Sequence, residues 1–233
     1  VIEFLLTNTT KASLLLTGNN NDYNVFISGK LSEIISTTTG KTEYELSSSF
    51  NPESVTYILI SKRTEAGNSN EAEIFSGLEV DSNGKLSLFE YSPLSRKLEF
   101  LGDSITCGYG MMVNSSSDPL CSNPQGIIED NWLSYGPLIG RNFRARVHIE
   151  SWSGKGLVKN YGDTPPSADP FPIYFNRTIA VDETPIYNYA QFIPDAVIIN
   201  LGTNDYSTTP VPSREMFEEA YRNFLSTIRE AYG

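Results

Sequence analysis

Three small-residue turns along the chain carry groups that suit acyl-transfer chemistry. Ser104, Gly154 and Asn204 each follow an apolar segment, and each lies 50 residues from the next. A serine hydroxyl at the end of a strand can attack an ester carbonyl. The backbone N–H groups of Ser104 and Gly154 and the side-chain amide of Asn204 can stabilise the resulting oxyanion, each contributing about 3–4 kcal/mol. We expect glycine at position 154 because a side chain there would block close approach of the backbone.

A general base is harder to find, because the chain has one histidine, His148. It lies six residues before Gly154 on an expected strand, about 20 Å away at roughly 3.3 Å per residue. A base must come within about 3.2 Å of the serine hydroxyl, or reach it through one water. We therefore expect His148 to be a structural or solvent-facing strand residue. Without a base the rate falls by about 10⁴- to 10⁶-fold, so we expect the isolated chain to be nearly inert.

The elements that position these turns alternate between strand and helix. Apolar segments predict strands at 97–101, 146–151 and 196–201, and helical periodicity predicts helices at about 132–144, capped by Asn131, and after Ser213. Gly136-Pro137 leaves open a kink in the first of these helices or a later start. The apolar face of the last helix is expected to comprise Met216, Phe217, Ala220, Tyr221, Phe224, Leu225 and Ile228. This alternation predicts a parallel sheet with helices on both faces. Ligands bind outside the carboxyl ends of such strands, so the three turns are expected to converge at one edge.

The beginning of the chain shows a different pattern. Seven short apolar or β-branched segments follow one another at about ten-residue spacing, with turn signals between them. They are Val1–Leu6, Leu14–Thr17, Tyr23–Ile27, Leu31–Ile35, Glu43–Leu46, Val55–Ile60 and Ile74–Val80. This pattern predicts a β-sandwich. We therefore expect an all-β accessory domain over residues 1–90 and an α/β domain over residues 96–233.

Three blocks of sequence resemble the SGNH (GDSL-type) hydrolases. They are GDSITCGYG from Gly102, SWSGKGL from Ser151 and NLGTNDYS from Asn200, which look like blocks I, II and III. Their details are similar to carbohydrate esterase family two. That resemblance implies a three-layer α/β/α fold behind a jelly-roll domain. It also implies a secreted serine esterase that removes O-acetyl groups from plant-wall polysaccharides or oligosaccharides through an acetyl-enzyme on Ser104, without a cofactor.

The chain departs from this family mainly in its general base. The family takes its base from a D-x-x-H-like block far beyond block III, and residues 1–233 contain no such block. The doubly wound sheet would also need another strand–helix pair, and Val1 enters the strand pattern midway. We therefore expect a chain trimmed at both ends, with the sheet incomplete at its C-terminal side.

Other residues near the three blocks are expected to support the site rather than to react. Asp103 is expected to shape the turn that carries the serine rather than to act as a catalytic acid. The aromatic residues Tyr109, Trp152 and Tyr206 adjoin the three blocks, and they could stack on a sugar face or belong to the core.

The two cysteines, Cys107 and Cys121, flank a short polar loop. A disulfide between them would add about 3 kcal/mol and would imply an oxidising compartment. The alternative is two unrelated buried thiols.

The overall composition excludes several partners. The chain has 17 Lys and Arg against 28 Asp and Glu, a net charge of −11. Such a chain repels phosphate backbones and anionic membrane surfaces, so we expect no nucleic-acid or membrane partner. No apolar run reaches the roughly 18 residues that span a bilayer. One histidine and two cysteines exclude a clustered His/Cys metal site, and we expect no metal.

Two other functions remain open. The chain could be a carbohydrate-binding protein with a catalytically incomplete hydrolase domain, or an SGNH lipase or thioesterase. The three intact turn residues argue against the first function, and the lack of an amphipathic lid or extended apolar groove argues against the second. The oligomeric state stays open.

Overall fold

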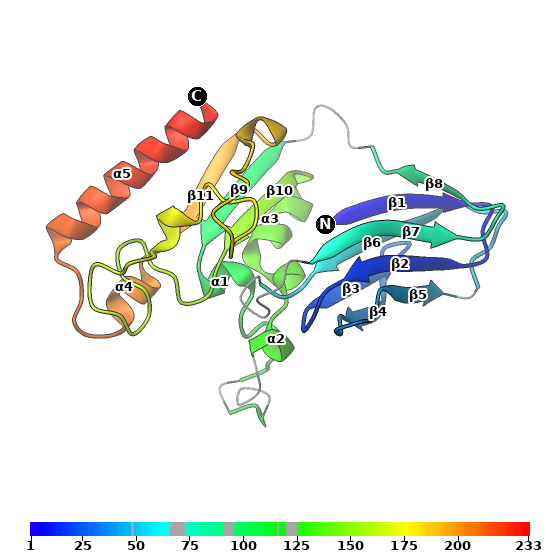
Figure 1. Ribbon diagram of the computed structural model, residues 1–233, viewed down its shortest axis with the longest axis horizontal. Coiled ribbons are helices and arrows are strands. Elements are labelled where there is room, and N and C mark those ends of the chain that lie inside the picture. Colours follow the sequence, from blue (N-terminus) through cyan, green and yellow to red (C-terminus); the bar gives the residue numbers. More distant parts are fainter. Residues whose placement is uncertain (48, 66–72, 91–95, 116, 120–124) are drawn as a thin grey trace. The chain divides into compact units, whose positions relative to one another are not determined.

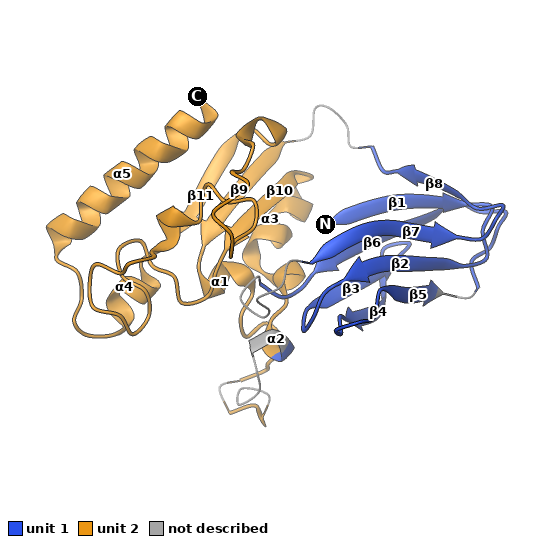
Figure 2. Cartoon of the chain, viewed as in Figure 1, with its two compact units in different colours: residues 1–93, 124–127 blue, residues 94–123, 128–233 orange. Residues whose placement is uncertain are grey.

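The computed structural model describes residues 1–47, 49–65, 73–90, 96–115, 117–119 and 125–233. The chain divides into two compact units (Figure 2). Unit 1 comprises residues 1–93 and 124–127, and unit 2 comprises residues 94–123 and 128–233. Each unit has its own sheets and its own hydrophobic core.

Unit 1 contains two antiparallel sheets (Figure 1), with strand orders β4-β3-β6-β1-β8 and β5-β2-β7. The strands are β1 (Ile2–Thr7), β2 (Ala12–Thr17), β3 (Asp22–Ile27), β4 (Lys30–Ser36), β5 (Glu43–Ser47), β6 (Thr56–Lys62), β7 (Ile74–Val80) and β8 (Lys85–Leu88). Both sheets contribute to one core, Phe4, Val25 and Ile58 from the first and Leu14 and Leu46 from the second. The seven predicted strands all occur, with ends shifted by at most two residues.

Unit 2 contains a parallel sheet of three strands in the order β10-β9-β11. They are β9 (Lys97–Gly102), β10 (Arg146–Ser151) and β11 (Ala196–Asn200). Gly102 pairs with Ser151 on one side and with Asn200 on the other. The three strands therefore end at the same level, as the sequence predicted for the edge that carries the site.

Two helices cover opposite faces of this sheet (Figure 1). Gly136 of α3 (Tyr135–Phe143) lies against Phe100 of β9. On the other face, Phe224 of α5 (Arg214–Tyr232) packs in a core with Leu101. The remaining helices are short: α1 (Ser104–Cys107), α2 (Gln125–Ile128), α4 (Thr203–Ser207) and the 3₁₀ turns η3 (Asn131–Leu133), η4 (Phe171–Ile173) and η5 (Tyr189–Gln191).

The structure corrects two helix predictions. The helix expected from Trp132 begins at Tyr135, with Ser134 as its N-cap, because Pro137 is tolerated only in a first turn. On α5, Met216 and Leu225 were expected on the buried face, but each is 38% exposed. The apolar stripe of this helix is wider than the surface that covers it.

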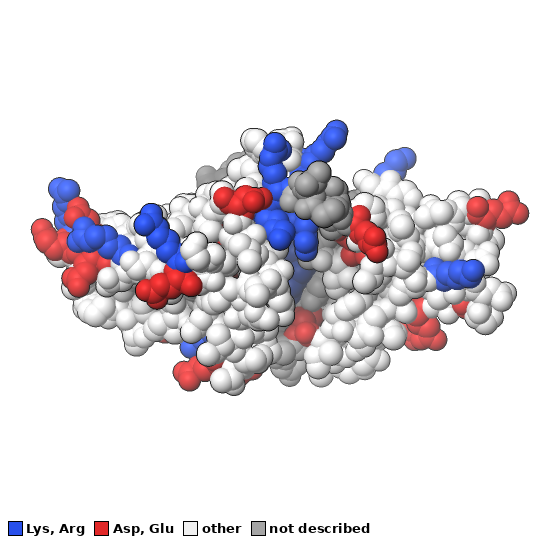
Figure 3. Space-filling model, turned by 90° about the horizontal axis from the view of Figure 1, so that it is seen from above, with Lys and Arg blue, Asp and Glu red and all other residues white. Residues whose placement is uncertain are grey.

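The outer side of α5 carries charges of both signs. Arg214 Nε lies 2.6 Å from Glu218 Oε1, and Arg222 Nη1 lies 3.7 Å from Glu218 Oε2. Figure 3 shows basic and acidic side chains close together at this end of unit 2. Within the described ranges, no helix is long and apolar enough to cross a membrane.

Candidate active site

The candidate nucleophile, Ser104, is the first residue of α1, directly beyond the end of β9. Asp103 is the N-cap of this helix, and its Oδ1 accepts a hydrogen bond from the Ile105 N–H at 3.1 Å. Asp103 is fully buried, and burial raises the pKa of its carboxyl. These contacts hold the sharp turn that carries Ser104.

Two backbone N–H groups at this edge are not used by another described residue. Among the residues that the structure describes, neither Ser104 N–H nor Gly154 N–H has a hydrogen-bond acceptor. Gly154 has a φ of +79°, which favours glycine, but the nearest atom to a Cβ built there is Tyr161 Cβ at 4.0 Å. Glycine is therefore required here by the backbone conformation. The predicted reason, that a side chain would block close approach of the backbone to the reacting ester, stays a prediction.

Asn204 links the other two turns. Its Nδ2 donates to Lys155 O at 2.7 Å, next to Gly154, and to Asp103 Oδ2 at 3.3 Å, next to Ser104. Asn204 is 6% exposed and belongs to the short helix α4, which follows β11. The structure thus brings the three turns together at the carboxyl edge of the sheet.

The three aromatic residues near the blocks have different surroundings. The Trp152 ring lies 4.7 Å from the Tyr174 ring, and Lys155 Nζ lies 5.3 Å from the Trp152 ring centre. Tyr109 and Tyr206 are about half exposed, at 47% and 49%. A role for these rings in sugar binding stays a prediction.

A polar network fixes the loop beneath Trp152. Lys155 Nζ donates to Asp169 Oδ2 at 2.6 Å, and the Tyr174 hydroxyl donates to the same oxygen at 2.8 Å. Although burial acts in the opposite direction, hydrogen bonds from Lys155 and Tyr174 lower the pKa of Asp169. This network ties the turn after β10 to the long loop that follows it.

His148 lies within the strand and not at its end. It pairs with Glu99 in the register of β10 and β9, and its Nδ1 lies 2.9 Å from Glu99 Oε1. The same oxygen accepts the Tyr232 hydroxyl at 2.7 Å, and the His148 ring stacks on Tyr187 at 5.2 Å. These contacts hold His148 against Glu99 and Tyr187, away from the strand end that carries the site.

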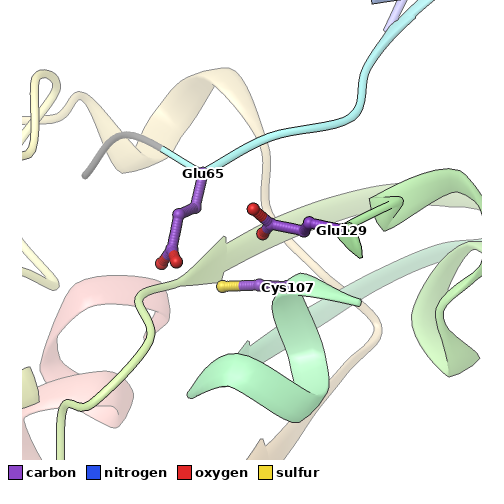
Figure 4. Close-up of side chains that lie close together, drawn as sticks. All are labelled: Glu65, Cys107 and Glu129. Atoms are coloured by element: carbon purple, nitrogen blue, oxygen red, sulfur yellow. The ribbon is translucent and has the colours of Figure 1, made fainter. Parts of the chain in front are cut away.

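The thiol of Cys107 lies at the end of α1. It donates to Ser151 Oγ at 3.2 Å and lies within 4.8 Å of a carboxylate oxygen of Glu129 (Figure 4). Cys121, its predicted disulfide partner, lies outside the described residues, so the disulfide stays a prediction.

Comparison with known proteins shows the protein family to which this chain belongs. Residues 100–233 match the GDSL-like Lipase/Acylhydrolase family. Because the match covers more than half of the chain, the chain belongs to this family. Within this family, its homologues and structural neighbours are family two carbohydrate esterases.

Two curated relatives illustrate the similarity. Cellulase/esterase CelE of Acetivibrio thermocellus is 36% identical over 179 residues, which are 76% of this chain and 20% of CelE. An acetylxylan esterase/glucomannan deacetylase of Cellvibrio japonicus is 35% identical over 114 residues, 48% of this chain and 30% of that protein. The chain thus spans less than a third of the length of either relative.

Solved structures agree with this family. A family two carbohydrate esterase from Clostridium thermocellum, in complex with cellohexaose, superposes with a TM-score of 0.84 at 32% identity, covering 99% of this chain and 67% of that one. The acetyl xylan esterase Est2A from Butyrivibrio proteoclasticus gives a TM-score of 0.83 at 19% identity, covering 98% of this chain and 69% of that one. The second likeness supports the fold alone.

Proposed function

We propose that the protein containing these residues is a serine esterase that removes O-acetyl groups from plant-wall polysaccharides or oligosaccharides. The observation that carries the proposal is the pair of hydrogen bonds from Asn204 to Lys155 O and Asp103 Oδ2. They bring the Asn204 amide beside the turns that hold Ser104 and Gly154. Because these two bonds use both of its N–H groups, the longer one, to Asp103 Oδ2 at 3.3 Å, is exchanged for the oxyanion in the proposed reaction. The names of the relatives support the acetyl ester as substrate.

In the proposed reaction, the Ser104 hydroxyl attacks the acetyl carbonyl carbon while a general base takes its proton. The N–H groups of Ser104 and Gly154 and the amide of Asn204 stabilise the oxyanion of the tetrahedral intermediate. The C–O bond to the sugar breaks, the sugar oxygen takes the proton, and the acetyl group remains on Ser104. Water then attacks this ester, gives its proton to the base and releases acetate, which restores the serine.

In our proposal, residues 1–233 do not supply the general base of this reaction. His148, their one histidine, is engaged by Glu99 within the sheet. Loss of a triad base typically lowers the rate by about 10⁴-fold or more. We therefore propose that these residues alone are nearly inactive and that the base belongs to another part of the protein.

The accessory part of the proposal concerns unit 1 and location. We propose that residues 1–90 form a jelly-roll β-sandwich before a hydrolase domain at residues 96–233. The shared core of the two antiparallel sheets supports it. We also propose that the protein is secreted, because polymeric substrates lie outside the cell.

The test is acetate release from acetylated xylan and acetylated glucomannan by the full-length protein. Ser104→Ala should reduce release by about 10³-fold or more, because the nucleophile is lost. Ser226→Ala, on the exposed side of α5, is the matched control and should leave release unchanged. Unchanged release by Ser104→Ala would contradict the proposal. Glycan binding without acetate release would favour the binding protein, and a preference for longer acyl chains would favour a lipase or thioesterase.

A further inference from the structure

The carboxylate of Asp205 holds the backbone that follows Gly154. Asp205 is fully buried. Its Oδ1 accepts the N–H groups of Val158 at 2.7 Å and Lys159 at 2.9 Å, and its Oδ2 accepts that of Leu157 at 2.9 Å. Three consecutive N–H groups thus converge on one carboxylate, and charge-assisted bonds of this kind are about twice as strong as neutral ones.

Gly156 permits this close approach. A Cβ built there would lie 2.7 Å from Asp205 Oδ2 and 2.0 Å from the carbonyl oxygen of Lys159. Both distances are too short for a side chain, so the loop can close around the carboxylate only with glycine at this position. The residue next to Asp205 on α4 is Asn204, whose amide binds Lys155 O. The loop that begins at Gly154 and helix α4 are therefore joined by adjacent contacts.

Lys159 joins the same two segments at the opposite end of α4. Its side chain is fully buried. Its Nζ donates to Thr208 Oγ1 at 2.7 Å, to Thr208 O at 2.9 Å and to Asn204 O at 3.4 Å. Thr208 is the C-cap of α4, where carbonyl groups lack helical partners and favour a cation. A single loop residue thus binds Asp205 with its N–H and the end of the helix with its ammonium group.

We propose that Asp205 and Lys159 are positioning residues that clamp helix α4 to the loop at residues 154–159. The clamp fixes the Asn204 amide relative to the Gly154 N–H, which are the donors that follow β11 and β10. This inference rests on the proposed function, because it concerns the oxyanion donors of that reaction. Misplacement of reacting groups by about 1 Å can cost roughly 100-fold in rate, so the clamp contributes to catalysis without touching substrate.

The kinetic test uses the full-length protein and p-nitrophenyl acetate. Asp205→Asn keeps the size of the side chain but sets an NH₂ group against the loop N–H groups. We expect kcat to fall by about 100-fold while KM stays within about twofold. Asp163→Asn is the matched control in the segment that follows this loop. Its carboxylate accepts the Ser167 hydroxyl, and its kcat should match wild type. A kcat of Asp205→Asn within about twofold of wild type overturns the clamp. So does a KM that rises by about the same factor as kcat falls.

A spectroscopic test is independent of turnover. With isotope-labelled glycine and asparagine, we expect the NMR signals of the Gly154 N–H and the Asn204 side-chain NH₂ to shift in Asp205→Asn and not in Asp163→Asn. Lys159→Met leaves the Asp205 carboxylate in place and should also shift the Asn204 signal. If Asp205→Asn does not fold, this variant tests the clamp in its place. Unmoved signals overturn the clamp. A wild-type protein that releases no acetate overturns the proposed function alone, and the signals then still test the clamp.

Discussion

At the scale of single residues, the carboxyl of Glu150 carries a pH dependence of stability. Burial, and then the charge of Glu99, raise its pKa well above the ordinary value of 4.5. The folded state therefore keeps a proton that the unfolded state releases near that value. It follows that the free energy of unfolding decreases as the pH rises from about 4.5, because the folded protein must either keep that proton or bury a charge.

Replacement of Glu150 by glutamine tests this reasoning. Glu150→Gln should melt at a higher temperature than wild type at about pH 7, because no charge must be buried. The gain should shrink toward zero as the pH falls below about 4.5, where the wild-type carboxyl becomes protonated in the unfolded state as well. Thermal melting from about pH 4 to 8 measures it, with Glu230→Gln on the exposed side of α5 as a control that should show no such trend. A gain in melting temperature that is the same at every pH would sink the idea.

Single residues also differ in how far their surroundings follow from sequence. The convergence of Ser104, Gly154 and Asn204 could be predicted, because each directly follows an apolar strand of a parallel sheet. The contacts of Lys159 could not. A lysine in a polar loop is expected in solvent, whereas this one is buried against Thr208, 49 residues further along the chain. Its only hint in the sequence is its position shortly after the SGKG turn.

At the scale of elements, strands with a buried side were the easiest to predict. An apolar run marks each of them, as in β2, where Leu14 and Leu16 of a three-leucine run are buried. The strand β8 was missed although Leu86 and Leu88 alternate with polar residues, because four residues are too few to mark a strand and all four are exposed. The short helix α4 was taken for a turn, since five residues are too few to show a helical period.

The longest helix, α5, offers a test of capping. Ser213 Oγ accepts the N–H of Met216 at 3.2 Å, as the sequence predicted. Ser213→Ala removes this bond and should cost about 1 kcal/mol, or roughly 2–4 °C in melting temperature. Ser226→Ala on the same helix is the control, and it should be neutral or slightly stabilising because alanine favours helix. Equal losses from both substitutions would count against the cap.

At the scale of the whole molecule, the chain consists of two units with separate cores. The core of unit 1 draws its buried residues from positions 4–60, and that of unit 2 from positions 101–228. The change from strand-rich to alternating sequence near Arg96 predicted such a division. What the sequence pattern could not supply is which strands share a sheet, because pairing such as that of β1 with β6 joins distant segments.

Separate cores predict that the two units unfold in two thermal transitions. Ile58 is fully buried in unit 1, and Phe224 is 2% exposed in unit 2. Ile58→Ala should cost about 2–5 kcal/mol and lower one transition by at least about 8 °C, because it leaves a cavity in that core. Phe224→Ala should cost about 3–5 kcal/mol and lower the other transition, so each variant serves as the control for the other. Scanning calorimetry measures both. A single transition whose melting temperature falls in both variants would contradict this prediction. It would mean that the two cores unfold together, because loss of packing in one core would then destabilise the entire chain.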